Sequence, residues 1–206
     1  LQRREAEGSD RGQLTLHEKL AEARARLMAA GIAEAEASID VDVYARTILG
    51  WDRARLLAER SGPTPAALEP TFSGWIARRE RREPTAYIVG VREFWGLDFL
   101  VTPAVLIPRP ETEFIVEEAV KLLSSAALSA GSHLSEQIRI ADIGTGSGCG
   151  AVALAHECPD CVVVASDVST PALDVARANA VRHGVAHHIQ FVTTSYLDDI
   201  PGPFDV

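Results

Sequence analysis

Long apolar runs, an export signal and a basic charge surplus are all missing from this sequence of 206 residues. No apolar stretch approaches the roughly 18–20 residues that a membrane-spanning helix needs, and the charged N-terminus lacks the apolar core of a secretory signal. Cysteine is scarce, and 3 cysteines without framework spacing favour a reducing compartment. We therefore expect a cytoplasmic protein with no membrane partner.

The charge balance bears on possible partners. The 20 Lys and Arg residues are outnumbered by 29 Asp and Glu residues, which gives a formal net charge of -9. Because a protein that binds a nucleic-acid duplex neutralises phosphates and normally carries a basic surplus, no direct nucleic-acid partner is expected. The remaining composition, 47% hydrophobic and 24% charged, is that of a globular protein and excludes a mainly disordered or collagen-like chain.

The first part of the chain predicts a flexible tail over residues 1–13 and a helical domain over residues 14–84. Thr15 and Glu18 have the spacing of a capping box, and apolar residues follow at helical intervals. Further helices are expected over about 33–49, 51–60 and 64–82. The arginine-rich run 78–82 favours a solvated helix face, with a surface for a partner as the alternative.

Residues 85–110 predict a β-hairpin linker between two domains. Aromatic and β-branched residues over 87–91 and 94–101, interrupted near Gly96, are typical of two short strands. Three prolines then stiffen the connection that follows: Pro103, Pro108 and Pro110.

Residues 111–206 alternate between helical and strand patterns. Short apolar strands are expected over 138–143, 162–165 and 189–193, with a fourth beginning at Phe204. This alternation predicts a parallel sheet with right-handed crossovers, and therefore an α/β, Rossmann-like domain. The chain lacks an initial Met and ends where a buried strand would begin. We therefore interpret it as a fragment whose last domain is incomplete at the C-terminus.

The most informative local feature is the glycine-rich loop 144–148, which stands between a predicted strand and a predicted helix. Missing side chains let a ligand approach the backbone, whose N–H groups then face a polar or acidic group. Asp167 ends the next strand, where a carboxylate can accept hydrogen bonds from both ribose hydroxyls of a nucleoside. These features leave three interpretations open: a methyltransferase, a nucleotide-dependent redox enzyme, and purely structural glycines.

Other reactive side chains favour structural roles. Cys158 and Cys161 have C-x-x-C spacing, but the sequence offers no second pair to complete a zinc site. A histidine cluster in a later loop lacks a carboxylate or cysteine at metal spacing. Cys149 begins a helix after the glycine loop, where packing is favoured over a nucleophilic role. We therefore expect no metal.

Three strings upstream of the glycine loop decide between these interpretations. They are P-T-A-Y-I-V-G at 84–90, E-F-W-G-L at 93–97 and L-I-P-R-P-E-T-E at 106–113, followed by D-I-G-T-G-S-G at 142–148. With them, residues 14–206 resemble the PrmC/HemK family. Its members are S-adenosylmethionine-dependent methyltransferases that modify a glutamine side chain in peptide-chain release factors. The I-P-R-P-E-T-E string favours this branch over relatives that methylate a ribosomal protein.

The resemblance implies a class I methyltransferase domain and a role for particular residues. In the family, the glycine loop wraps the methionine part of the cofactor, which here concerns Gly144, Thr145, Gly146, Ser147 and Gly148. Asp167 would hold the ribose, Tyr196 would lie near the adenine and Leu106 near the cofactor. Arg109 and Glu111 would border the active site. The helical domain would help to dock the release factor.

Two departures from the family pattern affect the expected activity. Ser195 stands where the family often has an acid, so the contact with adenine is expected to be weaker or rebuilt. The family's Asn-Pro-Pro-Tyr signature, which holds the glutamine amide, does not occur in this sequence and is expected a few residues past Val206. We therefore expect a parent enzyme that methylates a release factor, and this chain by itself to be inactive or nearly so.

Several alternatives stay open at this point. An adenine-N6 nucleic-acid methyltransferase uses a similar Asn-Pro-Pro-Tyr motif, although the acidic charge balance counts against it. A methyltransferase of ribosomal-protein glutamine, a non-catalytic binding module and a nicotinamide-dependent oxidoreductase are the others.

Overall fold

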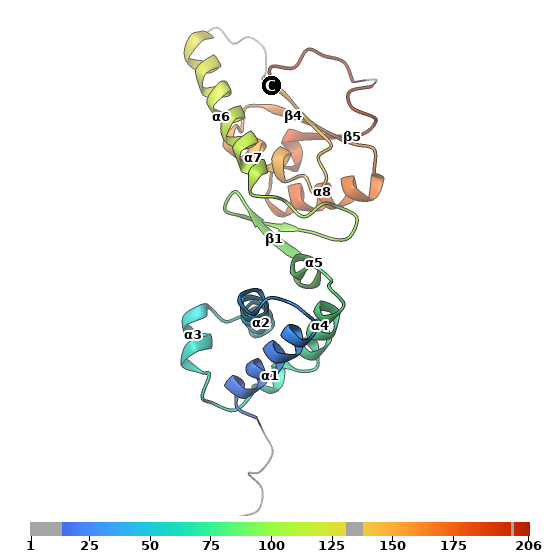
Figure 1. The fold of residues 1–206 in the computed structure, drawn as a ribbon. Helices are drawn as coiled ribbons and strands as arrows, with labels where there is room; N and C mark the ends of the chain where they lie inside the picture. Colours follow the sequence, from blue (N-terminus) through green and yellow to red (C-terminus); the bar gives the residue numbers. More distant parts are fainter. Residues whose placement is uncertain (1–13, 131–137, 199) are drawn as a thin grey trace, which may run out of the picture. The chain divides into compact units, whose positions relative to one another are not determined.

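A computed structural model describes residues 14–130, 138–198 and 200–206. The chain divides into two compact units, Leu1–Val89 and Gly90–Val206, which are taken here one at a time (Figure 1).

The first unit is a small bundle of helices around an apolar core. Its elements are α1 (Leu16–Ala29), α2 (Glu34–Leu49), α3 (Arg53–Ala58), a 3₁₀ turn (Ala66–Leu68), α4 (Thr71–Glu80) and α5 (Thr85–Val89). The predicted capping box is confirmed, because the Thr15 hydroxyl accepts a hydrogen bond from the Glu18 amide while the Glu18 carboxylate accepts from the Thr15 amide. In the core, the rings of Tyr44 and Trp75 meet edge to face with centroids 5.5 Å apart.

Two predicted elements of this region are wrong. The helix expected over 64–82 begins only at Thr71, after the 3₁₀ turn and Pro70. The strand expected over 87–91 is instead the short helix α5, whose first turn forms because the amides of Tyr87 and Ile88 both bond the carbonyl of Pro84. Ile88 is buried in the helical core, so the structure places residues 85–89 in the first unit rather than in a linker.

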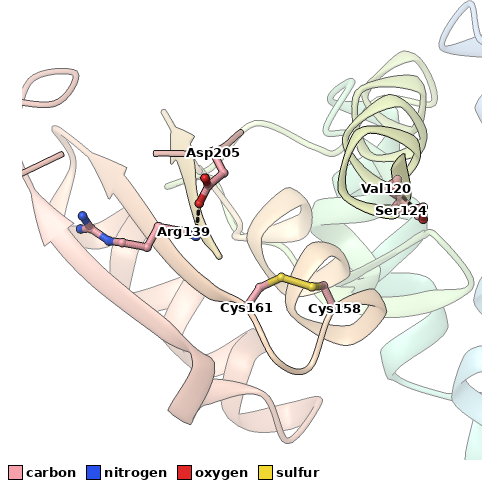
Figure 2. Close-up of a disulfide and its surroundings, with 6 residues drawn as sticks. All are labelled: Val120, Ser124, Arg139, Cys158, Cys161 and Asp205. Atoms are coloured by element: carbon pink, nitrogen blue, oxygen red, sulfur yellow. Dashed lines mark hydrogen bonds between the residues drawn. A yellow bond between two sulfur atoms is a disulfide. The ribbon is translucent and has the colours of Figure 1, made fainter. Parts of the chain in front are cut away.

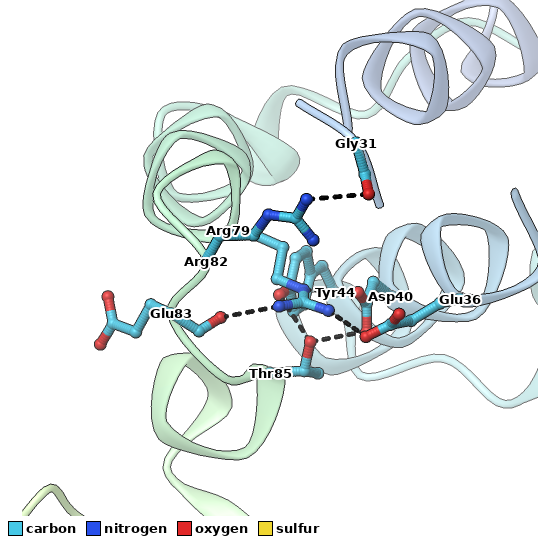
Figure 3. Close-up of polar contacts among 8 residues, drawn as sticks. All are labelled: Gly31, Glu36, Asp40, Tyr44, Arg79, Arg82, Glu83 and Thr85. Atoms are coloured by element: carbon cyan, nitrogen blue, oxygen red, sulfur yellow. Dashed lines mark hydrogen bonds and ion pairs between the residues drawn. The ribbon is translucent and has the colours of Figure 1, made fainter. Parts of the chain in front are cut away.

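The arginine run is only in part a solvated face, because Arg81 and Arg82 are exposed whereas Arg79 is buried (Figure 3). Arg79 is buried, and its guanidinium forms an ion pair with the buried carboxylate of Asp40 at 2.7 Å and a second one with Glu36. It also donates to the carbonyl of Glu83 at 3.2 Å, while Arg82 donates to the carbonyl of Gly31 at 2.8 Å. The arginines therefore hold elements of the helical unit together.

The same cluster fixes the start of α5. The Thr85 hydroxyl lies 2.6 Å from a carboxylate oxygen of Asp40 and 2.9 Å from the hydroxyl of Tyr44 (Figure 3). Arg78 pairs with Glu83 and donates to the carbonyls of the last residues of α5. Carbonyls at a helix end lack partners within the helix, so this arginine satisfies groups that would otherwise need water.

The second unit combines a hairpin with a parallel sheet and flanking helices. Its elements are β1 (Val91–Phe94), β2 (Leu97–Leu100), α6 (Glu111–Ala130), β3 (Arg139–Ile143), α7 (Cys149–Glu157), β4 (Val162–Asp167), α8 (Thr170–Arg182), a 3₁₀ turn (Ala186–His188) and β5 (Ile189–Thr193). The strands β3, β4 and β5 are parallel and adjacent in that order, which confirms the predicted α/β topology.

The hairpin belongs to the core of this unit rather than acting only as a linker. Its tip is formed by Trp95 and Gly96, both with positive φ, as a two-residue turn between β1 and β2 requires. Trp95 donates from its backbone to Glu113 on α6 and from its indole to Glu157 on α7. Phe94 and Phe99 are buried in the same apolar cluster as the sheet, so the hairpin packs into the core of the second unit.

The last residues of the chain pair with the other edge of β3 (Figure 2). The Asp205 amide donates to the carbonyl of Arg139 at 2.8 Å, and the Ala141 amide donates to the carbonyl of Val206 at 2.9 Å. This is the pairing expected if a fourth strand begins here. The strand β3 thus has β4 on one side and residues 205–206 on the other. In open α/β sheets, ligands bind beside such a reversal of strand order, at the carboxyl ends of the strands.

Candidate functional site

The carboxyl ends of the three parallel strands bring the candidate residues to one edge of the sheet. Ile143 at the end of β3 is in register with Ser166 of β4, and Asp167 of β4 is in register with Thr193 of β5. The glycine loop leaves β3 at this edge and enters α7. The loop is held against β4 because the amides of Gly144 and Thr145 both donate to the carbonyl of Ser166, at 2.8 and 2.9 Å.

The loop glycines have two different surroundings. Gly144, Gly146 and Gly148 all have positive φ, a conformation that side-chain-bearing residues rarely adopt. A Cβ at Gly148 would lie 2.9 Å from the Cβ of Ala176, so this glycine lets α8 approach the loop. A Cβ at Gly144 would meet no atom within 4 Å, and one at Gly146 would meet only the Gly144 carbonyl at 3.9 Å. The first two glycines therefore border open space.

A partly buried carboxylate, Asp142, braces the loop. One of its oxygens accepts hydrogen bonds from the Thr145 hydroxyl at 2.6 Å and from the Ala151 amide at 2.9 Å. Burial raises the pKa of Asp142, although these two hydrogen bonds oppose the shift. No role for Asp142 is predicted from the sequence, although a carboxylate near the end of a buried strand and just before a glycine loop is a signal for one.

Asp167 lies directly beside the loop, as the sequence predicts. Its carboxylate accepts from the Gly146 amide at 3.0 Å and from the Ser169 amide at 2.9 Å, one bond to each oxygen. A carboxylate oxygen has two acceptor positions, so each of the two oxygens retains one. The arrangement suits a ligand that presents two neighbouring hydroxyl groups.

Exposed apolar side chains accompany Asp167 at this edge. Tyr196 is 75% exposed and Val168 is 72% exposed, while Ile143 is 46% exposed. Tyr196 has a positive φ, and its carbonyl accepts a hydrogen bond from the Ser166 hydroxyl at 2.9 Å, which anchors the turn after β5. Tyr196 is among the residues predicted from the sequence, whereas Val168 and Ile143 are not. An apolar residue directly after Asp167 was the clue to Val168.

Leu106, expected near the cofactor, and Arg109, expected to border the active site, lie in the segment between the hairpin and α6, and Glu111 is the first residue of α6. Leu106 is 70% exposed, and Arg109 and Glu111 are exposed as well. The Thr112 amide bonds the carbonyl of Arg109 at 3.0 Å, which starts the first turn of α6. Among the described residues, no hydrogen bond or ion pair joins the side chains of Arg109 or Glu111 to the glycine loop.

The three cysteines, for which the sequence favours structural roles, lie in a buried position or in a disulfide. Cys149 is buried, and burial raises the pKa of its thiol to about 11, so the thiol is protonated near neutral pH. Cys158 and Cys161 form a disulfide in the turn between α7 and β4 (Figure 2). Within the described ranges, no group of three His, Cys, Asp or Glu residues could hold a metal ion, and no helix is long and apolar enough to cross a membrane.

Comparisons with known proteins agree with this geometry. Residues 18–90 match the PrmC N-terminal domain and residues 117–206 match the methyltransferase small domain. A release factor glutamine methyltransferase of Bradyrhizobium diazoefficiens is 41% identical over 182 residues, or 88% of this chain. The chain belongs to the PrmC/HemK family.

Other members of the PrmC/HemK family align over shorter stretches. A release factor glutamine methyltransferase of Chlorobaculum tepidum is 38% identical over 83% of this chain, and one of Nitratidesulfovibrio vulgaris is 49% identical over 61%. The chain spans 59% of the Bradyrhizobium relative, 58% of the Chlorobaculum relative and 41% of the Nitratidesulfovibrio relative.

Proposed function

We propose that the protein containing this chain transfers a methyl group from S-adenosylmethionine to a glutamine side-chain amide in a peptide-chain release factor. The observation that carries the proposal is the open face of the glycine loop beside Asp167, in a chain of the PrmC/HemK family. The proposed acceptor is taken from the relatives, several of which are named release factor glutamine methyltransferases.

The residues at the sheet edge fit S-adenosylmethionine in three respects. The open space at Gly144 and Gly146 leaves room for the methionine part to approach the backbone. The two remaining acceptor positions of Asp167 match the two ribose hydroxyls. The exposed side chains of Tyr196 and Val168 offer apolar surface to the adenine. In this proposal Thr145, Ser147 and Gly148 shape the loop, Leu106 lies near the cofactor, and Arg109 and Glu111 border the acceptor.

The chemistry needs alignment more than activation. An amide nitrogen is a poor nucleophile because its lone pair is delocalised into the carbonyl. S-adenosylmethionine, when bound, would supply a methyl group on a positively charged sulfur. In a direct displacement the amide nitrogen would gain the methyl group and lose a proton, and the neutral thioether S-adenosylhomocysteine would leave. The glycine loop and Asp167 would fix the donor, so that the reaction gains from proximity and orientation. The family resemblance assigns the hold on the amide to the Asn-Pro-Pro-Tyr signature.

The helical unit is the proposed docking platform for the release factor. It has an apolar core and internal ion pairs of its own, which would hold such a surface in shape. Release factors act in translation, so we propose that the protein works in the cytoplasm. Because the chain has a formal net charge of -9, we also propose that it makes no direct contact with nucleic acid.

The test is transfer of a tritiated methyl group from S-adenosylmethionine to a purified release factor. The matched control is the same factor with its acceptor glutamine changed to Ala. The assay uses this chain and a version extended at its C-terminus by the corresponding segment of the Bradyrhizobium relative. Label in the unchanged factor alone supports the proposal. Label in DNA, RNA or a ribosomal protein instead would assign a different acceptor, and label in none of them with the extended version would refute the proposal.

A further inference from the structure

One side chain, Asn179 on α8, connects the glycine loop to the hairpin. Asn179 is completely buried, and polar side chains in such positions are normally held by hydrogen bonds. Its amide nitrogen donates to the carbonyl of Ser147 in the loop at 2.9 Å and to the carbonyl of Leu100 at 3.0 Å. Its amide oxygen accepts from the Leu100 amide at 2.7 Å.

The pairing with Leu100 has a particular form. The Asn179 side chain bonds both backbone groups of the last residue of β2, as a peptide group of a neighbouring strand would. Leu100 is followed by the buried Val101 and then by the segment that carries Leu106. The segment is therefore held at its start by the pairing of β2 with β1 and by the hydrogen bonds of Asn179.

On the other side of Asn179, α8 also packs closely against the glycine loop. Ala176 lies one helical turn before Asn179 on α8, and it packs where Gly148 has no side chain. A single face of α8 thus contacts two neighbouring loop positions, one by packing at Gly148 and one by the hydrogen bond to Ser147. Few alternative loop positions satisfy both contacts, because a displaced loop would leave a buried amide donor without its acceptor.

We propose that Asn179 is a positioning residue that couples the cofactor loop to the hairpin and to the segment leading to Leu106. The inference rests on the proposed function for its biological meaning, since it concerns how the cofactor site and the edge of the acceptor site are set relative to each other. Ordering of the loop by a bound cofactor is transmitted through Asn179 to Leu100, and a change at Leu100 is transmitted back to the loop.

The experiment compares amide hydrogen exchange in the unchanged chain, Asn179→Ala, Asn179→Asp and the control Ile189→Ala. Asp is nearly the size of Asn and keeps the acceptor for the Leu100 amide, but it presents an oxygen to the two carbonyls. Ile189 is also buried, at the opposite end of β5 from the loop, so its truncation lowers stability without removing any of the Asn179 hydrogen bonds. Exchange is measured without cofactor and at saturating S-adenosylmethionine.

The expected result without cofactor is faster exchange in both Asn179 variants at Leu100 and at the loop amides of Gly146 and Gly148, by about tenfold, which corresponds to ~1.4 kcal/mol. Ile189→Ala should not accelerate exchange selectively at Leu100, Gly146 and Gly148. With cofactor, the unchanged chain should gain protection at Leu100 as well as in the loop, and Asn179→Asp should gain it in the loop alone.

The inference is overturned if the Asn179 variants exchange like Ile189→Ala at these amides, or if Asn179→Asp passes cofactor protection to Leu100 as the unchanged chain does. Failure of the proposed function is a separate result. If S-adenosylmethionine protects nothing in the unchanged chain, the cofactor assignment fails, while the measurements without cofactor still decide whether Asn179 couples the two segments.

Discussion

Replacing Arg79 with Met tests the arginine cluster of the helical unit most sharply. The change removes the guanidinium but keeps an unbranched apolar stem, and it leaves the carboxylate of Asp40 buried without its cation. The two side chains are 8% and 7% exposed and 2.7 Å apart, so solvent screens this pair little. Removing one partner of a buried ion pair costs about 3–5 kcal/mol. The pair with Glu36 adds little, because that side chain is 55% exposed.

The assay is urea unfolding followed by tryptophan fluorescence in a Trp95→Phe background, so that emission reports on the helical unit. Arg81→Met is the matched control, since Arg81 is exposed in the same run and its loss should change the unfolding free energy by less than ~0.5 kcal/mol. The double variant with Asp40→Leu should recover much of the loss, because no unpaired charge remains and Thr85 keeps Tyr44 as a partner. A loss below ~1 kcal/mol for Arg79→Met, or strictly additive single losses, would refute the reasoning.

Three further predictions concern the glycine loop and its surroundings. Burial raises the pKa of Asp142 in the folded chain, so its contribution to stability is greatest below its unfolded pKa and is lost as pH rises through the folded value. Asp142→Asn should therefore gain in unfolding free energy relative to the unchanged chain as the pH rises above about 4, the unfolded pKa of an Asp side chain, measured by urea unfolding. Gly148→Ala should cost ~1–2 kcal/mol for its positive φ and ~1–3 kcal/mol more for the contact with Ala176, measured by thermal unfolding; a normal melting curve would contradict this. Because burial raises the pKa of Cys149 to about 11, iodoacetamide should label it far more slowly near pH 8 than in urea, as intact mass will show.

Much of the second unit follows from local sequence patterns. Apolar runs of strand length, separated by helical patterns, predict the parallel order of β3, β4 and β5. The placement of Asp167 beside the loop follows from the same pattern, because adjacent parallel strands end at one edge. Ser169 caps α8 as predicted, with its hydroxyl accepting from the Ala172 amide.

The errors lie where tertiary contacts override local preference. Residues 87–91 have a strand-like composition, but burial of Ile88 and the carbonyl contacts of Arg78 stabilise a helical turn there. Sequence spacing also cannot reveal that Arg79 faces Asp40, because the partners are 39 positions apart. Asn179 could have been noticed, since it shares the apolar face of α8 with Ala172 and Ala176, where a polar residue indicates a buried hydrogen bond.

The most direct test of the cofactor assignment is calorimetric titration of the chain with S-adenosylmethionine, with Gly144→Ala as the paired variant and NAD as the competing ligand. A methyl group at Gly144 enters open space rather than protein, so the variant should fold with a loss of only ~1–2 kcal/mol from its positive φ. We predict saturable binding of S-adenosylmethionine, no binding of NAD, and a clear loss of affinity in Gly144→Ala. Binding of NAD in its place, no binding of S-adenosylmethionine, or equal affinity in the variant would contradict the assignment.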